Sequence, residues 1–184
     1  MNVEALQRVA KHLQIIGVRP INISFSSDPE GKFLTTAPGA ITSFSRFQWT
    51  CTGRGDFKIK NQSDEVPRNV ISLIFNTVVN IAVQPESGPI PESDPIPENL
   101  MIAKIEVVFA VDYQVDVEPE TLDVEGINEF IQSNAPYHFW PYWREVVQSL
   151  SLRGQVPVPS LPHFRVVPAA QNIENSLAAE KEKP

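Results

Sequence analysis

Alternation of apolar and polar residues with a period of two marks four segments of the chain as strands. This period places every second side chain on the same face of a strand, so each such segment has one apolar and one polar face. The segments are a short one at residues 21–26 and three longer ones at about residues 47–60, 69–84 and 101–117. Because the long segments keep one polar face, the pattern predicts an antiparallel sheet with one face against the core.

The segment at residues 47–60 contains two glycines, which weaken the middle of a strand and indicate a bend or bulge. They are Gly53 and Gly55. The pattern predicts one shared apolar face on both sides of this point, made of Phe47, Trp49, Cys51, Phe57 and Ile59.

Helical spacing of apolar residues appears at both ends of the predicted sheet. Residues 1–17 show it without the features of a secretory signal, and we interpret them as an N-terminal helical extension. Residues 137–153 form an aromatic-rich helix that Arg153-Gly154 ends, with Pro141 one turn in, where its missing N–H is tolerated. A short helix or turn is expected near residues 122–131, and another helix at 172–183.

This order of elements predicts an α+β domain, a four-stranded antiparallel sheet with helices packed on one face. We divide the chain into the extension at residues 1–17, the α+β domain at 18–168, and a C-terminal helix or flexible tail at 169–184. Between the third and fourth strands, the segment PESGPIPESDPIPEN repeats with a period of six. Its prolines exclude a regular strand or helix, so we expect an extended, acidic, polyproline-like loop that connects a hairpin, with docking of a polyproline reader as the alternative.

The composition disfavours two classes of protein, those that bind nucleic acid and those that span a membrane with helices. The 184 residues carry a net charge of −7 with scattered basic residues, which disfavours nucleic acid as a partner. No apolar run approaches the ~18 residues of a membrane-spanning helix. A single cysteine, Cys51, excludes an internal disulfide and suits a cytoplasmic location.

A search for catalytic or metal-binding groups finds no convincing set. The three histidines, His12, His138 and His163, have no metal-ligand spacing, and Cys51 lies on a predicted apolar strand face, which favours an inert thiol. The RGD triplet at residues 54–56 lies inside a predicted strand, so we interpret it as coincidental. We therefore expect no enzyme, metal or cofactor, and keep an enzyme or a small-ligand domain as a remote alternative that would need a polar pocket with converging titratable groups.

Residues 137–162 resemble the bacterial export chaperone SecB. The SecB family opens its main helix with an aromatic-Pro-Tyr-x-Arg-Glu motif, continues with an apolar run to an Arg-Gly stop, and then has a proline-containing loop. The matching residues are Trp140-Pro141-Tyr142-Trp143-Arg144-Glu145, then Arg153-Gly154, and then Leu161-Pro162-His163-Phe164. The order of the strands extends this resemblance through the middle of the chain.

The resemblance implies an ATP-independent chaperone (a holdase) that binds unfolded or pre-export polypeptides and assembles as a homotetramer. In SecB the main helices pack between two sheets, so the implied assembly residues are Trp140, Tyr142, Trp143 and Val147. The alternative is a dedicated chaperone or adaptor for one partner, such as a SecB-like protein attached to a toxin–antitoxin pair.

The resemblance also places the binding surfaces. The family uses the loop after the first strand for clients, and the apolar residues of that loop here are Phe33, Leu34, Ile41 and Phe44. Acidic residues on the first strand of SecB dock the SecA motor. The matching positions are the uncharged Asn22 and Ser26, whereas Glu106 retains a matching acid on the fourth strand.

Overall fold

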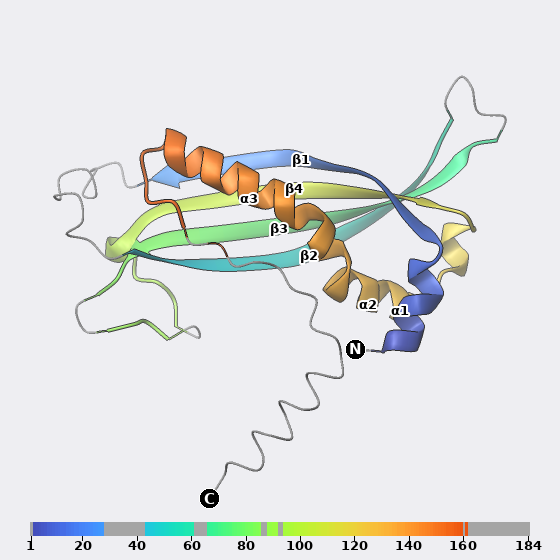
Figure 1. Ribbon diagram of the computed structural model, residues 1–184, viewed down its shortest axis with the longest axis horizontal. Coiled ribbons are helices and arrows are strands. Elements are labelled where there is room, and N and C mark those ends of the chain that lie inside the picture. Colours follow the sequence, from blue (N-terminus) through green and yellow to red (C-terminus); the bar gives the residue numbers. More distant parts are fainter. Residues whose placement is uncertain are drawn as a thin grey trace, which may run out of the picture.

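An antiparallel sheet of four long strands organises the part of the chain that the structure describes (Figure 1). The computed structural model describes residues 2–27, 43–60, 66–85, 88–91, 94–159 and 161. The strands are β1 (Leu13–Ser27), β2 (Ser43–Ile59), β3 (Arg68–Val83) and β4 (Met101–Val115). Their order is β1-β4-β3-β2, so β4 and β3 are central and β1 and β2 are the edges. The predicted α+β class and its four-stranded antiparallel sheet are confirmed.

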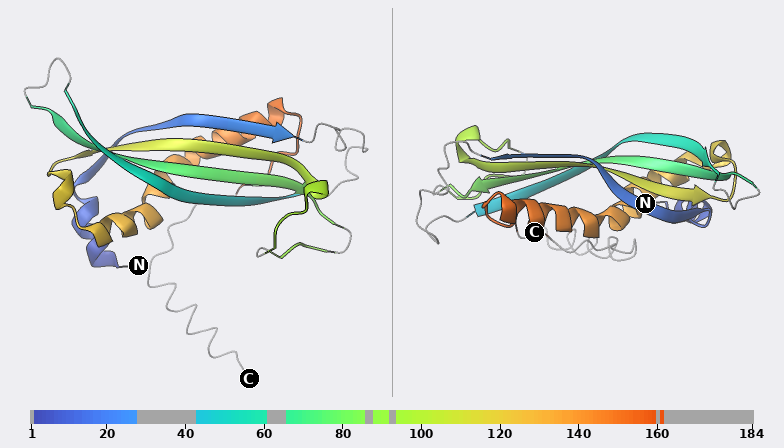
Figure 2. Two further views of the ribbon diagram at one scale, coloured as in Figure 1. Left: turned by 180° about the vertical axis from the view of Figure 1, so that it is seen from behind. Right: turned by 90° about the horizontal axis from the view of Figure 1, so that it is seen from above.

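Within the described residues, three α-helices accompany the sheet. They are α1 (Val3–Ala10), α2 (Val124–Ser133) and α3 (Ala135–Arg153), with short 3₁₀ turns at Glu98–Leu100 and Pro119–Thr121. The second view of Figure 2 shows α3 lying along one face of the sheet. The predicted stop at Arg153-Gly154 is confirmed. However, α3 begins two residues earlier than predicted, so Pro141 lies inside the helix, where it has no N–H to donate.

The core lies between α3 and the sheet. Phe139 of α3 is fully buried, and its ring centroid lies 4.9 Å from that of Phe75 on β3 and 5.8 Å from that of Phe109 on β4. Phe75 and Phe109 are direct register partners, so one aromatic side chain of the helix covers a cross-strand pair. We call the surface of the sheet that α3 covers the inner face, and the opposite surface the outer face.

The N-terminal prediction needs correction. Residues 1–17 were expected to be helical, but α1 ends at Ala10 and β1 begins at Leu13. The first strand was expected to be short, and it has 15 residues. Val3, Leu6, Val9, Leu13 and Ile16 fit a helical period, yet pairing of Leu13 with Val115 and of Ile15 with Tyr113 draws the later residues into the sheet.

A bulge in β2 confirms the break expected at the glycines and overturns the predicted face. Cys51 pairs with Phe75 and Gly53 pairs with Ile74, so Thr52 is the extra residue. After the bulge, Phe57 pairs with Val70 on the outer face instead of sharing the inner face with Phe47. An inserted residue moves every later side chain to the opposite face of the strand. The period-two pattern of the sequence does not show where such a residue is inserted.

The connection between β3 and β4, which we expected to be extended and polyproline-like, contains three backbone hydrogen bonds of the kind that closes a turn, although Pro97 keeps polyproline-like angles, with φ −58° and ψ 138°. Backbone N–H groups three residues on donate to the carbonyls of Pro85, Pro91 and Pro97, at 3.1, 3.1 and 3.0 Å. The sequence period of six therefore corresponds to a turn every six residues.

Candidate functional site

The aromatic residues predicted for assembly lie mostly in the protomer's own core. Trp143 and Val147 are fully buried, and the Trp143 and Trp140 rings have centroids 4.2 and 4.9 Å from that of Phe47 on β2. Tyr142 differs from them because 51% of it is exposed. The structure brings Trp140, Trp143 and Val147 together under the sheet, and their role in assembly stays a prediction.

The side of α3 that faces away from the sheet carries exposed apolar residues. Tyr137 is 55% exposed, Tyr142 51% and Leu152 69%. Tyr137 and Leu152 lie on one helical stripe with Pro141, which is also exposed. The exposed apolar side chains therefore lie toward the two ends of α3, and the polar residues Glu145 and Gln148 lie between them on the same side.

Strand β1 adds a second apolar surface that sequence reasoning missed. It is an edge strand, and its isoleucines at positions 15, 16, 21 and 23 are 40–48% exposed. Register shifts between Ile15 and Gly17 and between Pro20 and Asn22 make Ile16 and Ile21 bulged residues. The apolar residues of the run LQIIGVRPINISF could have indicated this surface. Because we expected the first strand to be short, we did not expect the whole run to lie in an edge strand. Long apolar edge strands are typical sites for pairing with another chain.

The predicted partner-docking acid lies on the outer face. Glu106 pairs in register with Ser24 of β1 and forms an ion pair with Lys104, with Nζ and Oε1 2.8 Å apart. Asn22 and Ser26 occupy neighbouring positions on the same face. The structure therefore brings these three positions together, as the resemblance implies, around a carboxylate that an intramolecular lysine neutralises.

Of the four residues predicted to bind clients, Phe44 lies among those that the structure describes, whereas Phe33, Leu34 and Ile41 lie outside them. Phe44 is half-buried at the start of β2, where it pairs with Ala82 on the outer face. The guanidinium carbon of Arg46 lies 5.9 Å from the centroid of its ring. The predicted client-binding role of Phe44 therefore stays a prediction, with its position now known.

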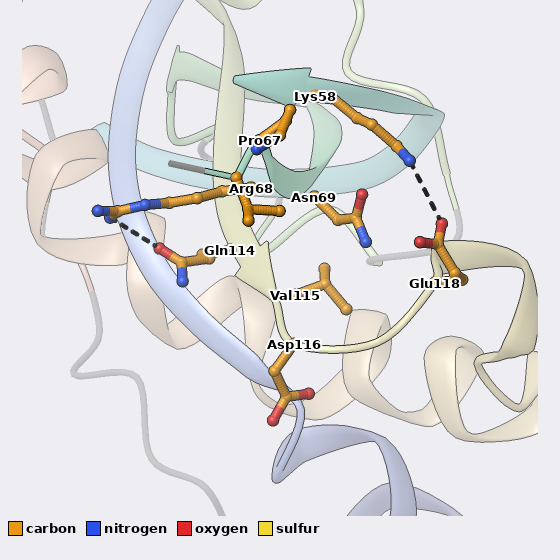
Figure 3. Close-up of a pocket in the computed structure, with 9 residues that line it drawn as sticks. Lys58, Pro67, Arg68, Asn69, Gln114, Val115, Asp116 and Glu118 are labelled. Atoms are coloured by element: carbon orange, nitrogen blue, oxygen red, sulfur yellow. Dashed lines mark hydrogen bonds and ion pairs between the residues drawn. The ribbon is translucent and has the colours of Figure 1, made fainter. Parts of the chain in front are cut away.

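A pocket of about 410 Å³ opens where β3 begins and β4 ends (Figure 3). Its charged and amide side chains make bonds within the protein. Lys58 Nζ lies 3.6 Å from Glu118 Oε2, Arg68 donates to Gln114 Oε1 at 3.3 Å, and Asn69 donates to a backbone carbonyl at 3.0 Å. Among the described lining residues, these groups are therefore held by bonds within the protein.

The cysteine and one of the histidines considered as reactive groups are partly buried in the protein. Burial raises the pKa of the Cys51 thiol, which keeps it protonated and poorly nucleophilic. His138 Nδ1 lies 2.9 Å from the Tyr113 hydroxyl, and burial lowers the pKa of His138 and raises that of Tyr113. Both side chains are therefore neutral at pH 7. Among the described residues, no group of three histidine, cysteine or acidic side chains could hold a metal ion.

The RGD triplet has a structural role. Arg54 Nε and Nη2 donate to the Asp56 carboxylate at 2.8 and 3.0 Å, and Nη2 also donates to the carbonyl of Pro119 at 3.1 Å. Arg54 thereby ties β2 to the turn that follows β4. None of the described helices is both long enough and apolar enough to span a membrane.

Comparison with known proteins identifies the fold. No family model matches the sequence, and no curated protein matches it. Among solved structures, the chain is similar to a SecB-like chaperone of Mycobacterium tuberculosis, in complex with a ChAD peptide from the HigA1 antitoxin. The TM-score is 0.54 at 13% sequence identity, over 88% of this chain and 97% of that one. The chain therefore has a SecB-like fold, which confirms the resemblance inferred from its sequence motifs at the level of the fold.

Proposed function

We propose that this protein is an ATP-independent chaperone that binds segments of other polypeptides. The observation that carries this proposal is the SecB-like fold combined with exposed apolar residues on both β1 and α3. Burial of a few hundred Å² of client surface contributes several kcal/mol at about 25 cal/mol per Å², before the entropic cost of association. This range suits reversible binding at micromolar concentration.

Aggregation of a chemically denatured client, followed by light scattering without nucleotide, tests the proposal. We expect the purified protein to suppress aggregation at a stoichiometric ratio, and ATP to have no effect. Unchanged light scattering at stoichiometric chaperone would overturn the proposal.

Self-association belongs to the same proposal, with a homotetramer of cytoplasmic protomers as the expected form. The 45% exposed Ile23 lies on the inner face of an edge strand next to Ser24, which lies on the outer face. We expect Ile23→Lys to lower the solution mass measured by light scattering, and Ser24→Lys to leave it unchanged. A wild-type mass of 20.6 kDa would contradict assembly.

The alternative is a dedicated chaperone for one partner, and the antitoxin peptide bound by the similar structure favours it. Such a protein would bind one peptide tightly and suppress aggregation of general clients weakly. Parallel titrations with several denatured clients and with an antitoxin-derived peptide distinguish the two functions.

We propose that SecA docks only weakly through β1 of this protein. Asn22 and Ser26 carry no charge, and Lys104 already pairs with Glu106. Surface plasmon resonance against immobilised SecA should therefore show weak binding that Glu106→Gln changes little. Tight binding that Glu106→Gln abolishes would contradict this expectation.

A further inference from the structure

Arg46 ties the β3–β4 connection to the outer face of the sheet. Its guanidinium donates to the carbonyl oxygens of Pro91 at 2.6 Å and Ile90 at 2.9 Å, and also to that of Asp94. These bonds involve an ionised donor and are stronger than bonds between neutral groups. The same guanidinium lies over the ring of Phe44, so one side chain connects the predicted client-binding residue to the connection.

The connection is longer than a hairpin requires. It has the 17 residues 84–100 between the ends of β3 and β4, whereas hairpin loops usually need about two to five. Its two Pro-Ile-Pro units have the same exposure pattern, with prolines 89, 91, 95 and 97 exposed and isoleucines 90 and 96 half-buried. The connection thus exposes proline rings in two units of the same sequence. Arg46 donates to carbonyls of the first unit and to that of Asp94, which precedes the second unit.

The proline rings and the charge of the connection indicate which kind of polypeptide it could bind. Proline rings pack against aromatic side chains, and they offer no N–H for the addition of a strand. The connection also carries four acidic residues and no basic one, so an acidic segment would be repelled from it.

We propose that the Pro-Ile-Pro units at residues 89–91 and 95–97 form one wall of the polypeptide-binding surface at Phe44. Arg46 is the residue that positions this wall, and the wall receives aromatic side chains of a non-acidic segment. This inference rests on the proposed chaperone function and assigns part of that function to the repeat. Because Arg46 fixes the connection before binding, less conformational entropy is lost when a partner binds.

Fluorescence anisotropy with two labelled peptides tests the proposal. One peptide is neutral and extended with two tryptophans, and the other has leucine at both positions. We expect the full-length protein to bind the tryptophan peptide about fivefold more tightly, since aromatic side chains pack on proline rings. Arg46→Met should bring this ratio close to one. Arg46→Lys, which keeps the charge but not the fork of donors, should give an intermediate ratio.

A photo-crosslinking side chain at position 96 provides a direct measurement that does not depend on the Arg46 variants. It should capture the tryptophan peptide, whereas the same group at Lys58, near the other end of β2, should capture much less. If peptides bind but crosslinking is equal at both sites and Arg46→Met leaves the ratio unchanged, the inference is overturned and the chaperone function stands. If neither the peptides nor denatured clients bind, the proposed function fails with it.

Discussion

The two faces of the sheet have opposite characters. On the inner face, Phe139 and Trp143 of α3 are fully buried against aromatic residues of the strands. On the outer face, the side chains of Arg19 and Asp112 lie 3.2 Å apart, and Lys104 pairs with Glu106. Apolar burial stabilises a fold far more than exposed ion pairs do. The comparison teaches that apolar contacts of the inner face hold the protomer together, whereas the outer face contributes exposed ion pairs of small energetic weight.

The largest effect should come from removing an inner-face aromatic side chain. Trp143→Ala should lower the free energy of unfolding by about 3–5 kcal/mol, because it leaves a cavity against Phe47. Its neighbour Tyr142 is half exposed, so Tyr142→Ala should change the stability by about 0.5 kcal/mol or less. Urea unfolding of both variants measures the difference, and equal losses would contradict the assignment of the inner face.

Two glycines offer the next contrast. A Cβ at Gly126 of α2 would overlap with the backbone carbonyl of Ala5 in α1, whereas a Cβ at Gly55 meets nothing within 4 Å. Gly126→Ala should therefore destabilise the protein by about 1–3 kcal/mol by pushing α1 away from α2. Gly55→Ala is the matched control, and thermal unfolding should find it within about 0.5 kcal/mol of the wild type. A neutral Gly126→Ala would contradict the close approach of the two helices.

The inner face should also make stability depend on pH through His138. Burial lowers the pKa of His138 below the ordinary value of 6.5, so the unfolded chain takes up this proton at a higher pH than the folded protein does. The stability contributed by neutral His138 is present above pH 6.5 and is lost as the pH falls through the folded pKa. Unfolding free energies measured from pH 7.5 to 5 should fall less steeply for His138→Gln than for the wild type. Parallel curves would contradict this assignment.

The smallest effect should come from the outer face. Lys104 and Glu106 are both partly exposed, so their interaction should contribute less than about 1 kcal/mol. A double-mutant cycle with Lys104→Met and Glu106→Gln measures the coupling, and high salt should reduce it further. Coupling as large as the loss in Trp143→Ala would erase the distinction between the two faces.

Local pattern in the sequence determined the central part of this protein. The period-two alternation of residues 69–84 and 101–117 predicted β3 and β4 to within two residues, because neither strand has an inserted residue in the middle of its pairing. Likewise, Arg153-Gly154 predicted where α3 ends. The motif of residues 140–145 predicted the SecB-like fold of the chain.

Only the tertiary structure decided the rest, because bulges and long-range bonds leave no local period. Pairing with β4 made residues 13–17 part of a strand, and the extra Thr52 turned Phe57 to the outer face. Burial against Phe47 separated Trp143 from the exposed Tyr142, although both lie in one motif. The bonds from Arg46 join residues 44 to 48 positions apart, so no window of sequence could have predicted them.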